Sequence, residues 1–340
     1  MGDPAGIGAE IIVKALAQAD IFTHCIPIVI GNRQSLEAAC TYCGISLELK
    51  PLSHVAEGKG TPGVIEYIHV GDEAQHFPLG AVSAACGSAA FQYIEKAIAL
   101  AQEKAIAAVV TGPINKEALN LAGHPFAGHT EIFAHYTNTL PEDFAMLLMS
   151  GALRVVHATT HVSIRDACDL ITPERVLSTI NLAHQAAQAI GIKNPKIAVA
   201  GLNPHASENG LFGHEEQTSI IPAIATAQAA GLDVTGPIPP DTVFVKAASG
   251  VYHMVVAMYH DQGHIPVKLH GFRVNPETGV LSHVSGVNTT IGLPIIRTSV
   301  DHGTAFDLAG KNLASHQSLR EALDVAVQMA HSKGCVSCSS

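Results

Sequence analysis

The sequence predicts a two-domain α/β protein. Short runs rich in β-branched residues alternate with longer Ala-rich stretches of helical periodicity, which is typical of strands and helices in regular alternation. The length of 340 residues is more than one hydrophobic core ordinarily holds, and it favours two domains. With 47% hydrophobic and only 14% charged residues, the composition is that of a well-buried globular chain rather than a disordered one.

The alternation places each expected element in order. Strands are expected at residues 26–30, 107–110, 155–158, 196–200 and 254–258. Helices are expected at residues 9–18, 84–103, 173–190, 220–230 and 319–330. Thr172 and Pro173 mark a helix start, because Thr caps helix N-termini and Pro fits the first helical position. No Gly/Ser-rich linker separates two domains, so we expect the chain to cross between them near residue 125 and to return near residue 295.

The charge of the chain excludes some classes of partner. Asp and Glu number 29 against 19 Lys and Arg, a formal net charge of −10, so neither nucleic acid nor an anionic membrane is an expected partner. No apolar run reaches the roughly 18 residues that a membrane helix needs. Met1 is followed at once by Gly-Asp-Pro-Ala-Gly rather than by a signal peptide. We therefore expect a soluble, cytoplasmic protein.

Two cysteine pairs have the spacing of metal ligands. Cys40 and Cys43, like Cys335 and Cys338, are separated by two residues, and two such pairs could form a four-thiolate zinc site. The first pair falls in an apolar helix end, however, and the second falls in a Ser-rich tail. Neither pair is assigned a role.

Histidine is unusually frequent, at 20 residues, and three histidines follow expected strands. His161, His205 and His260 each come a few residues after the end of a β-branched run. Open α/β sheets bind ligands outside the carboxyl ends of their strands. A single histidine in such a loop is usually a surface residue, but three of them resemble a three-histidine divalent metal site with open positions for a substrate.

Possible anion-binding residues fall in the same kind of position. Ala127-Gly-His-Thr-Glu131 is expected to be a loop that enters a helix, where backbone N–H groups, His129 and Thr130 could bind a phosphate. Arg297 ends another apolar run and could bind phosphate oxygens with two parallel hydrogen bonds. Lys268 and Asn288 are further candidates.

A Rossmann-type dinucleotide site is not expected, because no G-x-G-x-x-G motif opens a strand–helix unit. Two other segments could contact a dinucleotide. One contains Gly6 and Gly8, and the other is Asp301-His-Gly-Thr-Ala-Phe-Asp-Leu-Ala-Gly-Lys-Asn312. In the second segment Asp307 could accept the ribose hydroxyls of an adenosine, or it could be a solvated cap at a loop–helix turn. The pattern leaves both interpretations open.

Several motifs occur together and in a fixed order: Gly2-Asp-Pro-Ala-Gly-Ile-Gly8, Thr111-Gly-Pro-Ile-Asn-Lys116, Gly128-His-Thr-Glu131, Ala158-Thr-Thr-His161, Asn203-Pro-His205, Tyr259-His-Asp-Gln-Gly263 and Asp301-His-Gly-Thr304. From Gly2 to about residue 330 the chain resembles the 4-hydroxythreonine-4-phosphate dehydrogenase family. Members of that family have a buried strand ahead of Gly-Asp-Pro, where this sequence has only Met1.

The resemblance implies a fold and an assembly. Two α/β/α domains like those of the isocitrate and isopropylmalate dehydrogenases would form a homodimer, with the active site in the interdomain and dimer cleft. Residues 1–125 and 295–340 would form the cofactor-side domain. Residues 126–294 would form the domain that binds substrate and metal and makes the dimer contact.

The resemblance also implies roles for individual residues. Zinc, magnesium or cobalt would bind the metal-site residues, NAD would bind the cofactor residues, and Asp307 would favour NAD by repelling the 2′-phosphate of NADP. The implied metal ligands are His161, His205 and His260. The implied substrate contacts are His129, Thr130, Lys268, Asn288 and Arg297. The implied cofactor contacts are Gly6, Gly8, His302, Gly303 and Asp307.

The expected reaction follows from these parts. The motifs around Asn203 and His260 look closer to the paralogues that act on 4-phospho-D-threonate or 4-phospho-D-erythronate than to the enzymes of pyridoxine biosynthesis. Each substrate carries a C3 hydroxyl, so we expect metal-assisted oxidation at C3 by NAD, followed by decarboxylation. Lys116, Asp241 and a metal-bound water remain open as the general base.

Two other functions remain open from sequence. Three histidines could instead activate water in a metal-dependent hydrolase, although the segment 301–312 would then have no role. A non-catalytic sugar-phosphate-binding paralogue is the other alternative, although such a protein would be expected to lack the metal ligands that are present here.

Overall fold

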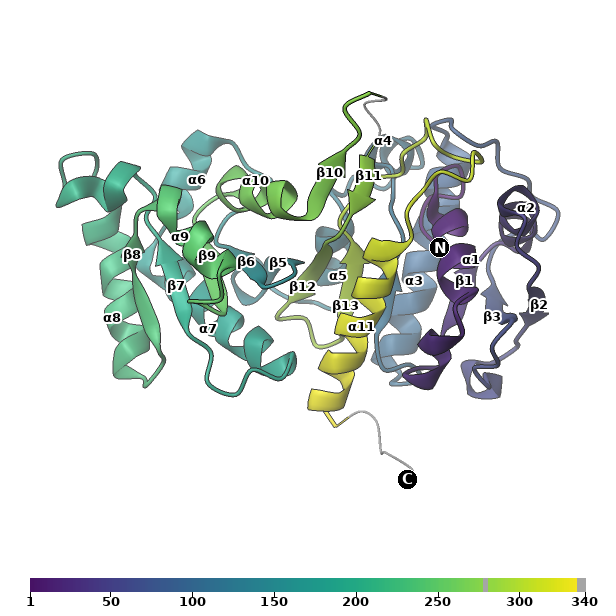
Figure 1. Ribbon diagram of the computed structural model, residues 1–340, viewed down its shortest axis with the longest axis horizontal. Coiled ribbons are helices and arrows are strands. Elements are labelled where there is room, and N and C mark those ends of the chain that lie inside the picture. The colour runs from purple at the N-terminus through teal and green to yellow at the C-terminus, as the bar shows by residue number, and fades with distance from the viewer. Residues whose placement is uncertain (278–280, 335–340) are drawn as a thin grey trace. The chain divides into compact units, whose positions relative to one another are not determined.

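Two compact α/β units make up the structure, a computed structural model that describes residues 1–277 and 281–334 (Figure 1). Unit 1 comprises residues 1–138 and 295–327, and unit 2 comprises residues 139–294 together with the chain from residue 328 on. The polypeptide thus leaves unit 1 after residue 138 and re-enters it at residue 295.

Unit 1 contains a small parallel sheet in which β3 (Val64–His69) lies between β1 (Ile28–Gly31) and β2 (Glu48–Pro51). A second parallel pair joins β4 (Val109–Thr111) to β13 (Arg297–Val300). The other elements that begin in unit 1 are α1 (Gly8–Leu16), η1 (Ala19–Thr23), α2 (Arg33–Cys43), η2 (Val55–Glu57), α3 (Ala84–Gln102), α4 (Lys116–Leu121), α5 (His129–Tyr136) and α11 (Gln317–Ser332). Its core forms where apolar residues of α1 pack on those of β3.

Unit 2 is built on a mixed sheet in the order β12-β5-β6-β9-β7-β8. The pairs between β12, β5 and β6 are antiparallel, and the pairs between β6, β9, β7 and β8 are parallel. These strands are β5 (Ala145–Ser150), β6 (Leu153–His157), β7 (Ile197–Ala200), β8 (Val234–Ile238), β9 (Met254–Ala257) and β12 (Val287–Ile291). Strands β10 (Phe272–Val274) and β11 (Leu281–Val284) form a separate antiparallel pair.

Helices cover the sheet of unit 2. Helix α10 lies above β6 in the view of Figure 1 and packs on a core that includes Val155 and Val255, whereas α7 lies below the strands. The helical elements of unit 2 are η3 (Pro141–Asp143), α6 (Ile164–Leu170), α7 (Pro173–Ala189), η4 (Pro204–Glu208), η5 (Glu216–Ile220), α8 (Ile221–Ala229), α9 (Pro240–Ala248) and α10 (His260–Gly271).

The elements expected from the sequence are confirmed as β1, β4, β6, β7, β9, α1, α3, α7, α8 and α11, and their ends differ from the expected ones by at most two residues. The N-cap of α7 is confirmed in detail, because the hydroxyl of Thr172 accepts a hydrogen bond from the backbone N–H of Arg175 at 3.2 Å. In this chain, long apolar helices and short β-branched strands can therefore be predicted from the sequence.

The first boundary between the units differs from the expected one at residue 125, because residues 126–138 belong to unit 1. Aromatic contacts account for the difference. Phe91 on α3 stacks on His124 with ring centroids 3.5 Å apart, and its ring also contacts Phe126 and Tyr136. Helix α5, which carries His129 and Thr130, is thereby fixed to α3 in unit 1 and not to the unit that carries the strand-end histidines.

Close packing of α3 on α4 makes Gly87→Ala a severe substitution. A Cβ atom at Gly87 would collide with the carbonyl of Ala118 and lie 2.8 Å from the backbone nitrogen of Leu119. Backbone atoms cannot move aside as a flexible side chain can, so we expect a loss of about 3 kcal/mol in the free energy of unfolding. Urea denaturation measures it. Ser88→Ala, one position further on the same helix, should change the free energy by less than about 0.5 kcal/mol, and an equal effect of both variants would contradict this packing.

Candidate active site

Three neighbouring parallel strands in unit 2 end at the same level. Val256 of β9 lies opposite Val156 of β6 on one side and Val199 of β7 on the other, and each strand ends one residue later. The loops that follow therefore begin side by side at one edge of the sheet. These are the three loops in which the sequence predicts metal-binding histidines.

Two of those histidines lie close together. His161, in the loop after β6, and His260, the first residue of α10, have ring centroids 5.8 Å apart. Hydrogen bonds hold the two loops side by side, since the backbone N–H and the hydroxyl of Thr159 both donate to the carbonyl of Met258, at 3.1 and 2.9 Å. The pair is thus positioned by the parallel pairing of β6 with β9 rather than by chance proximity.

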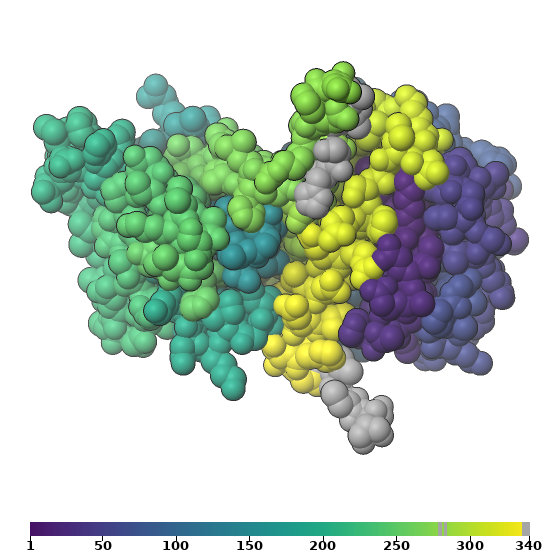
Figure 2. All heavy atoms as spheres, viewed as in Figure 1, coloured from purple at the N-terminus to yellow at the C-terminus, as the bar shows by residue number. Residues whose placement is uncertain are grey.

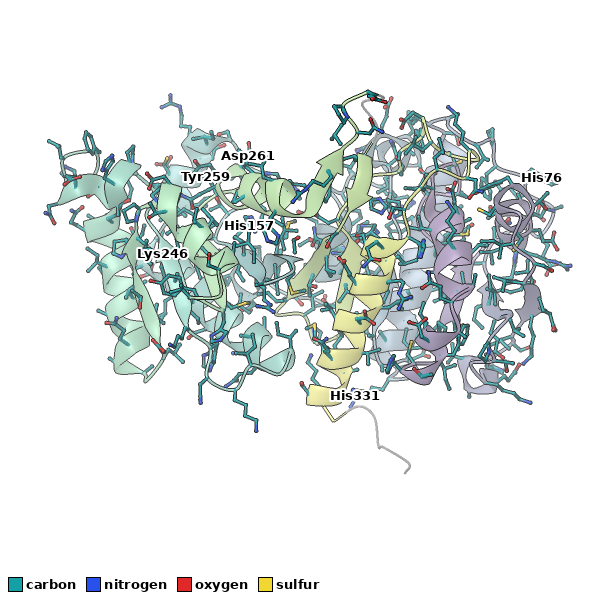
Figure 3. All side chains as sticks on the ribbon, in the orientation of Figure 1. His76, His157, Lys246, Tyr259, Asp261 and His331 are labelled. Carbon is teal, nitrogen blue, oxygen red and sulfur yellow. The ribbon has the colours of Figure 1, made fainter. Side chains whose placement is uncertain are left out.

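One ring nitrogen of His260 lies beside a carboxylate. Its Nδ1 lies 2.6 Å from Oδ1 of Asp261, so the carboxylate holds the Nδ1 proton and leaves Nε2 as the free lone pair. Figure 3 shows His157, Tyr259 and Asp261 gathered around the start of α10, well away from Lys246 on α9. A carboxylate behind a histidine ligand is the usual arrangement in protein metal sites.

His205 occupies a strained turn. From His205 to Asn209 every residue has a positive φ angle, between 48° and 66°. The left-handed conformation costs roughly 1–2 kcal/mol for each L-residue, so the surrounding structure must hold this turn in place. Such strain is found most often at functional sites. The ring of His205 is exposed, and its Nδ1 lies 3.4 Å from Oε2 of Glu208.

The donor chemistry of these histidines fits a divalent metal, although they are not assembled around a common centre. Across residues 1–277 and 281–334, no three His, Cys, Asp or Glu side chains form a ready-made metal cluster. His161 and His260 are brought together, and His205 is held on the adjacent loop. The three-histidine site therefore stays a prediction, supported by chemistry and by strand order.

Two histidines beside His260 were missed in the sequence analysis. The ring of His264 stacks on that of His260 with centroids 3.5 Å apart, and His157 lies 4.7 Å from His264. His157 is fully buried, and its Nδ1 lies 3.2 Å from the carbonyl of Met146. Gly263 accommodates it, because a Cβ there would collide with Nε2 of His157. A polar residue inside an apolar strand, as His157 is in β6, was the available signal.

Burial keeps both of these imidazoles neutral. It lowers the pKa of His157 from 6.5 to about 4 and that of His264 from 6.5 to about 3, with the neighbouring imidazoles adding to the effect. Neutral imidazoles neither repel a metal cation nor compete with His260 for a carboxylate. The surroundings of His260 therefore suit a cation near neutral pH.

Gln262 connects two of the three loops. It is buried, its Oε1 accepts from the backbone N–H of Met258 at 2.7 Å, and its Nε2 donates to the carbonyl of Gly201 at 2.8 Å. One side chain thus spans the end of β9 and the end of β7. Gln262 lies within the Tyr259–Gly263 motif, where sequence alone indicates no role for it, and its two bonds fix the loop of His260 relative to that of His205.

A candidate anion-binding group lies in unit 1, around a buried arginine. Arg297 on β13 is 2% exposed, donates to Oγ1 of Thr111 at 2.8 Å and lies over the ring of Phe133 at 5.7 Å. Burial lowers the pKa of Arg297 to about 9, and the opposing influence of Glu131 does not cancel it. The guanidinium therefore remains charged at neutral pH in a poorly solvated place, where an anionic ligand would stabilise it.

His129 and Thr130 complete this anion-binding group. His129 is the first residue of α5, whose backbone N–H groups at that end carry a partial positive charge. Burial, followed by the charge of Arg297, holds the pKa of His129 well below its usual range. Nε2 of His129 is buried and has no hydrogen-bond partner among the described residues. Arg297 therefore lies close enough to His129 for its charge to act on that imidazole, and Thr130 follows His129 on α5, while phosphate binding by the three residues stays a prediction.

The remaining substrate and catalytic candidates are more scattered. Lys116, at the start of α4, is exposed, and its Cε lies 4.0 Å from the Cβ position of Gly128, close to the start of α5. Lys268 on α10 lies over the ring of Phe272 at 4.5 Å, and Oδ1 of Asn288 is buried without a hydrogen-bond partner in the described part of the chain. Asp241 is exposed in the first turn of α9, a helix that packs on η4. Their roles stay predictions.

The two segments expected to contact a dinucleotide lie together in unit 1. The backbone N–H of Ile7 donates to the carbonyl of Thr304 at 3.0 Å, and a Cβ at Gly6 would lie 2.9 Å from the same oxygen. Further along, Oε1 of the buried Glu10 accepts from Lys14 and from the backbone N–H of Ala314, both at 2.8 Å. Figure 2 shows α1, in purple, directly beside the yellow segment that carries these residues.

The helix-cap interpretation of Asp307 is wrong. Asp307 is exposed in a series of turns, and no helix begins before Gln317 in this described segment. A cap needs the backbone N–H groups of a helix start, which are absent there. His302 and Gly303 precede it, with Nδ1 of His302 3.0 Å from the carbonyl of Gly303. Gly8 packs closely against the carbonyl of Met1 at the start of α1, where a Cβ atom would collide with that oxygen.

The cysteine pairs contribute no site to this picture. Cys40 and Cys43 lie on α2 as free thiols, and Cys335 and Cys338 fall outside the described residues. In the part of the chain that the structure describes, no helix combines the length and the apolar character that crossing a membrane requires.

An α/β enzyme that binds an anionic ligand is the class to which the fold and these groups point. Comparison with known proteins identifies the family within this class. A family model described as "Pyridoxal phosphate biosynthetic protein PdxA" matches residues 23–326. The chain therefore belongs to the PdxA family, and it is an oxidoreductase that acts as a dehydrogenase on CH–OH groups.

Curated relatives and solved structures resemble the chain over almost its whole length. The D-threonate 4-phosphate dehydrogenase of Cupriavidus necator is 48% identical over 97% of this chain and 96% of its own. The enzyme of the same name from Salmonella typhimurium is 46% identical over 97% of each chain. The crystal structure of a 4-hydroxythreonine-4-phosphate dehydrogenase from Klebsiella pneumoniae has a TM-score of 0.83 and 46% identity, covering 97% of this chain and 96% of that one. The mixed α/β architecture matches such structures.

The buried His157 makes stability depend on pH. The unfolded chain takes up a proton at this residue near pH 6.5 and the folded chain only near pH 4, so its contribution to stability is present above pH 6.5 and is lost as the pH falls toward 4. The loss amounts to about 3 kcal/mol. Urea denaturation at pH 7 and pH 4.5 should show His157→Asn losing less stability than the wild type. His54→Asn, at an exposed position, is the control, and the same pH dependence in His157→Asn would disprove the assignment.

Proposed function

We propose that the protein is a NAD-dependent, divalent-metal-assisted dehydrogenase that oxidises the C3 hydroxyl of a 4-phosphorylated four-carbon acid, and that the 3-oxo acid then loses carbon dioxide. The names of the relatives favour D-threonate 4-phosphate as the substrate. 4-Phospho-D-erythronate and 4-phosphooxy-L-threonine are the other candidates. The observation that carries the proposal is the buried Arg297 beside His129 at the start of α5, which suits a phosphate group.

Phosphate binding by this group would position the substrate. Arg297 can donate two parallel hydrogen bonds to phosphate oxygens, and the N–H groups at the start of α5 can donate others. His129, being neutral, can add one donor without repelling Arg297. Anchoring the C4 phosphate restricts the position of C3, and such positioning lowers the barrier of the chemical step. Lys116, near the start of α5, and Lys268 and Asn288 are the expected helpers.

His161, His205 and His260 would hold the divalent metal through neutral imidazole nitrogens. When bound, such a metal lowers the pKa of a coordinated hydroxyl and stabilises negative charge that develops on oxygen. Asp261 would keep His260 in the tautomer with Nε2 as the ligand atom. Gln262 would keep the loops of His260 and His205 at a fixed separation.

Bound NAD would supply the oxidant, accepting the hydride of C3 on its nicotinamide. The hydroxyl proton would go to a general base, for which Lys116 and Asp241 are the candidates from this chain. The ketone formed at C3 is β to the C1 carboxylate, so the C1–C2 bond breaks, carbon dioxide leaves, and a proton replaces it at C2. The product is a phosphorylated three-carbon ketone. Gly6, Gly8, His302, Gly303 and Asp307 would contact the NAD.

A homodimer is part of the proposal. Three apolar side chains of unit 2 are about 70% exposed: Ile164 on α6, Leu211 after η4 and Leu269 on α10. Burying such side chains against another protein chain would remove apolar surface from water, which favours association. A second copy of the chain is the partner that the family resemblance implies.

Among the alternative functions, a metal-dependent hydrolase would leave the packing of residues 301–316 on α1 without a purpose. A binding protein without activity is not favoured either, because the donors of the metal site are retained with a carboxylate behind His260. No observation made on the described residues favours the hydrolase or the binding protein over the dehydrogenase.

The proposal is tested by following NADH at 340 nm with D-threonate 4-phosphate, NAD and a divalent metal. We expect activity that a chelator removes and that Zn²⁺, Mg²⁺ or Co²⁺ restores. Arg297→Met, which fills the buried space without a charge, should raise KM for the phosphorylated acid roughly 10- to 100-fold, because a hydrogen bond to a charged group contributes about 1.5–3 kcal/mol. KM for NAD should not change. Equal effects on both KM values, or activity without metal, would refute the proposed roles.

Asp307→Asn tests the cofactor assignment. NADP would bring its 2′-phosphate against the Asp307 carboxylate, so the wild type should prefer NAD, and removal of the charge should reduce that preference about tenfold or more in relative kcat/KM. Thermal stability should not change, since Asp307 is exposed and caps no helix. Asp233→Asn, at another exposed acidic position, should leave the NAD/NADP ratio unaltered. An Asp307→Asn enzyme with wild-type discrimination would exclude the segment 301–312 from the adenosine site.

A further inference from the structure

The backbone ahead of His205 is held by a buried carboxylate on another element. Glu216 is fully buried, and its Oε1 accepts from the backbone N–H of Leu202 at 2.8 Å and from that of Asn203 at 2.7 Å. Its Oε2 accepts from Nδ2 of Asn203 at 2.9 Å. All three donors belong to the two residues that directly precede Pro204 and His205. Glu216 therefore fixes the entry to the left-handed turn.

The residue beside Glu216 holds the turn itself. Nε2 of Gln217 donates to Oγ of Ser207 at 3.0 Å, and the same Oγ accepts from the backbone N–H of Gly210 at 2.9 Å. Ser207 lies inside the strained stretch and Gly210 directly follows it. Two adjacent side chains of η5 thus hold the entry and the interior of the turn that carries His205.

The local backbone is shaped to allow this contact. Residues Glu216–Ile220 form a π-helical turn, a rare conformation that is often found at functional sites. Gly201 leaves room for the carboxylate, because a Cβ there would lie 3.1 Å from Oε1 of Glu216 and 2.9 Å from Cβ of Ala206. A buried carboxylate is costly to desolvate, and its bonds go to a strained loop rather than to a cation.

We propose that Glu216 is a positioning residue that holds the loop of His205 at the edge of the sheet where the loops of His161 and His260 also begin, so that His205 can take part in binding the divalent metal. The inference rests on the proposed function, in which His205 is one of the three ligands. Without Glu216 the residues from His205 to Asn209 would relax toward the right-handed region, which L-residues prefer, and His205 would be displaced. Residues that orient metal ligands usually change metal affinity 10- to 100-fold when they are replaced.

The test is isothermal titration calorimetry of Co²⁺ into metal-free protein, with no substrate present. Glu216→Gln keeps the shape of the side chain but replaces one of the two accepting oxygens with an amide N–H₂, which must then face either the backbone donors of Leu202 and Asn203 or Nδ2 of Asn203. The variant should therefore bind Co²⁺ at least tenfold more weakly than the wild type. Hydrogen exchange of the amides at residues 205–210 should become faster in the same variant. Unchanged Co²⁺ affinity in a folded Glu216→Gln protein would overturn the inference.

Glu66→Gln is the matched control in unit 1. Glu66 is 2% exposed, and its Oε2 accepts from the backbone N–H groups of Lys59 at 2.7 Å and Gly60 at 3.0 Å. Its replacement also removes a buried carboxylate from backbone donors, so it should lower the melting temperature while leaving Co²⁺ affinity unchanged. Equal losses of Co²⁺ affinity in both variants would show that Glu216 acts only through global stability.

Two further variants cover the remaining outcomes. Gln217→Ala removes the bond to Ser207 from an exposed position and should weaken Co²⁺ binding about threefold. If Glu216→Gln does not fold, Gln217→Ala is the deciding variant. Wild-type Co²⁺ affinity in Gln217→Ala would then contradict the positioning role of Glu216. His205→Ala should bind Co²⁺ at least as weakly as Glu216→Gln. Wild-type Co²⁺ affinity in His205→Ala would refute the proposed metal site. Weak Co²⁺ binding by His205→Ala together with wild-type binding by Glu216→Gln would refute only the positioning role.

Discussion

The parallel pairing of β6, β9 and β7 is the constraint on which the candidate site of unit 2 depends. Val256 is in register with Val156 on one neighbour and Val199 on the other, and all three strands end one residue later. Three loops must therefore begin at the same edge and at the same height. The separation of adjacent strands, about 5 Å, brings the side chains of neighbouring loops within reach of one another.

That edge has to hold polar groups next to an apolar sheet, and hydrogen bonding is what makes this possible. Gln262 occupies a buried position with both ends of its amide bonded to backbone groups of different loops. Glu216 does the same for the loop before His205. A buried polar group without partners costs about 1–3 kcal/mol, so each of these side chains is tied to one loop conformation. The loops are consequently more fixed than their exposed tips indicate.

The sequence was sufficient to predict most of the regular elements and to predict that His161, His205 and His260 each follow a strand, because both depend on local patterns. The strands before His161, His205 and His260 are β-branched runs, and such runs are buried strands in an α/β chain. Helix α10 was not predicted, since Gly263 and Pro266 interrupt its pattern. Proline inside a helix is ordinarily a stop signal. Strands β5 and β12, which pair antiparallel, were also not predicted, because periodicity does not distinguish a short buried apolar strand from a buried helix segment.

The parts of the site that were missed depend on long-range contacts. Nothing in Ala206, Ser207 or Glu208 favours a positive φ angle, so the left-handed turn follows from Glu216 and Gln217, which lie several residues further along the chain. The boundary near residue 125 failed to separate the units for the same reason, because the ring of Phe91 determines where α5 belongs. Sequence patterns report what a segment buries, but not which distant segment it is buried against.

Net charge and local charge lead to opposite expectations for an anionic ligand, and their ranges decide which of them matters. A formal charge of −10 repels anions at a distance, but salt at physiological strength screens that repulsion over about 8 Å. Arg297 acts at contact and in a desolvated place, where the interaction of two charges is several times stronger than in water. A pKa lowered to about 9 still leaves its guanidinium charged at pH 7. An acidic surface therefore excludes polyanions such as nucleic acid, which must lie along it, while a small phosphorylated molecule can still be bound tightly at one buried arginine.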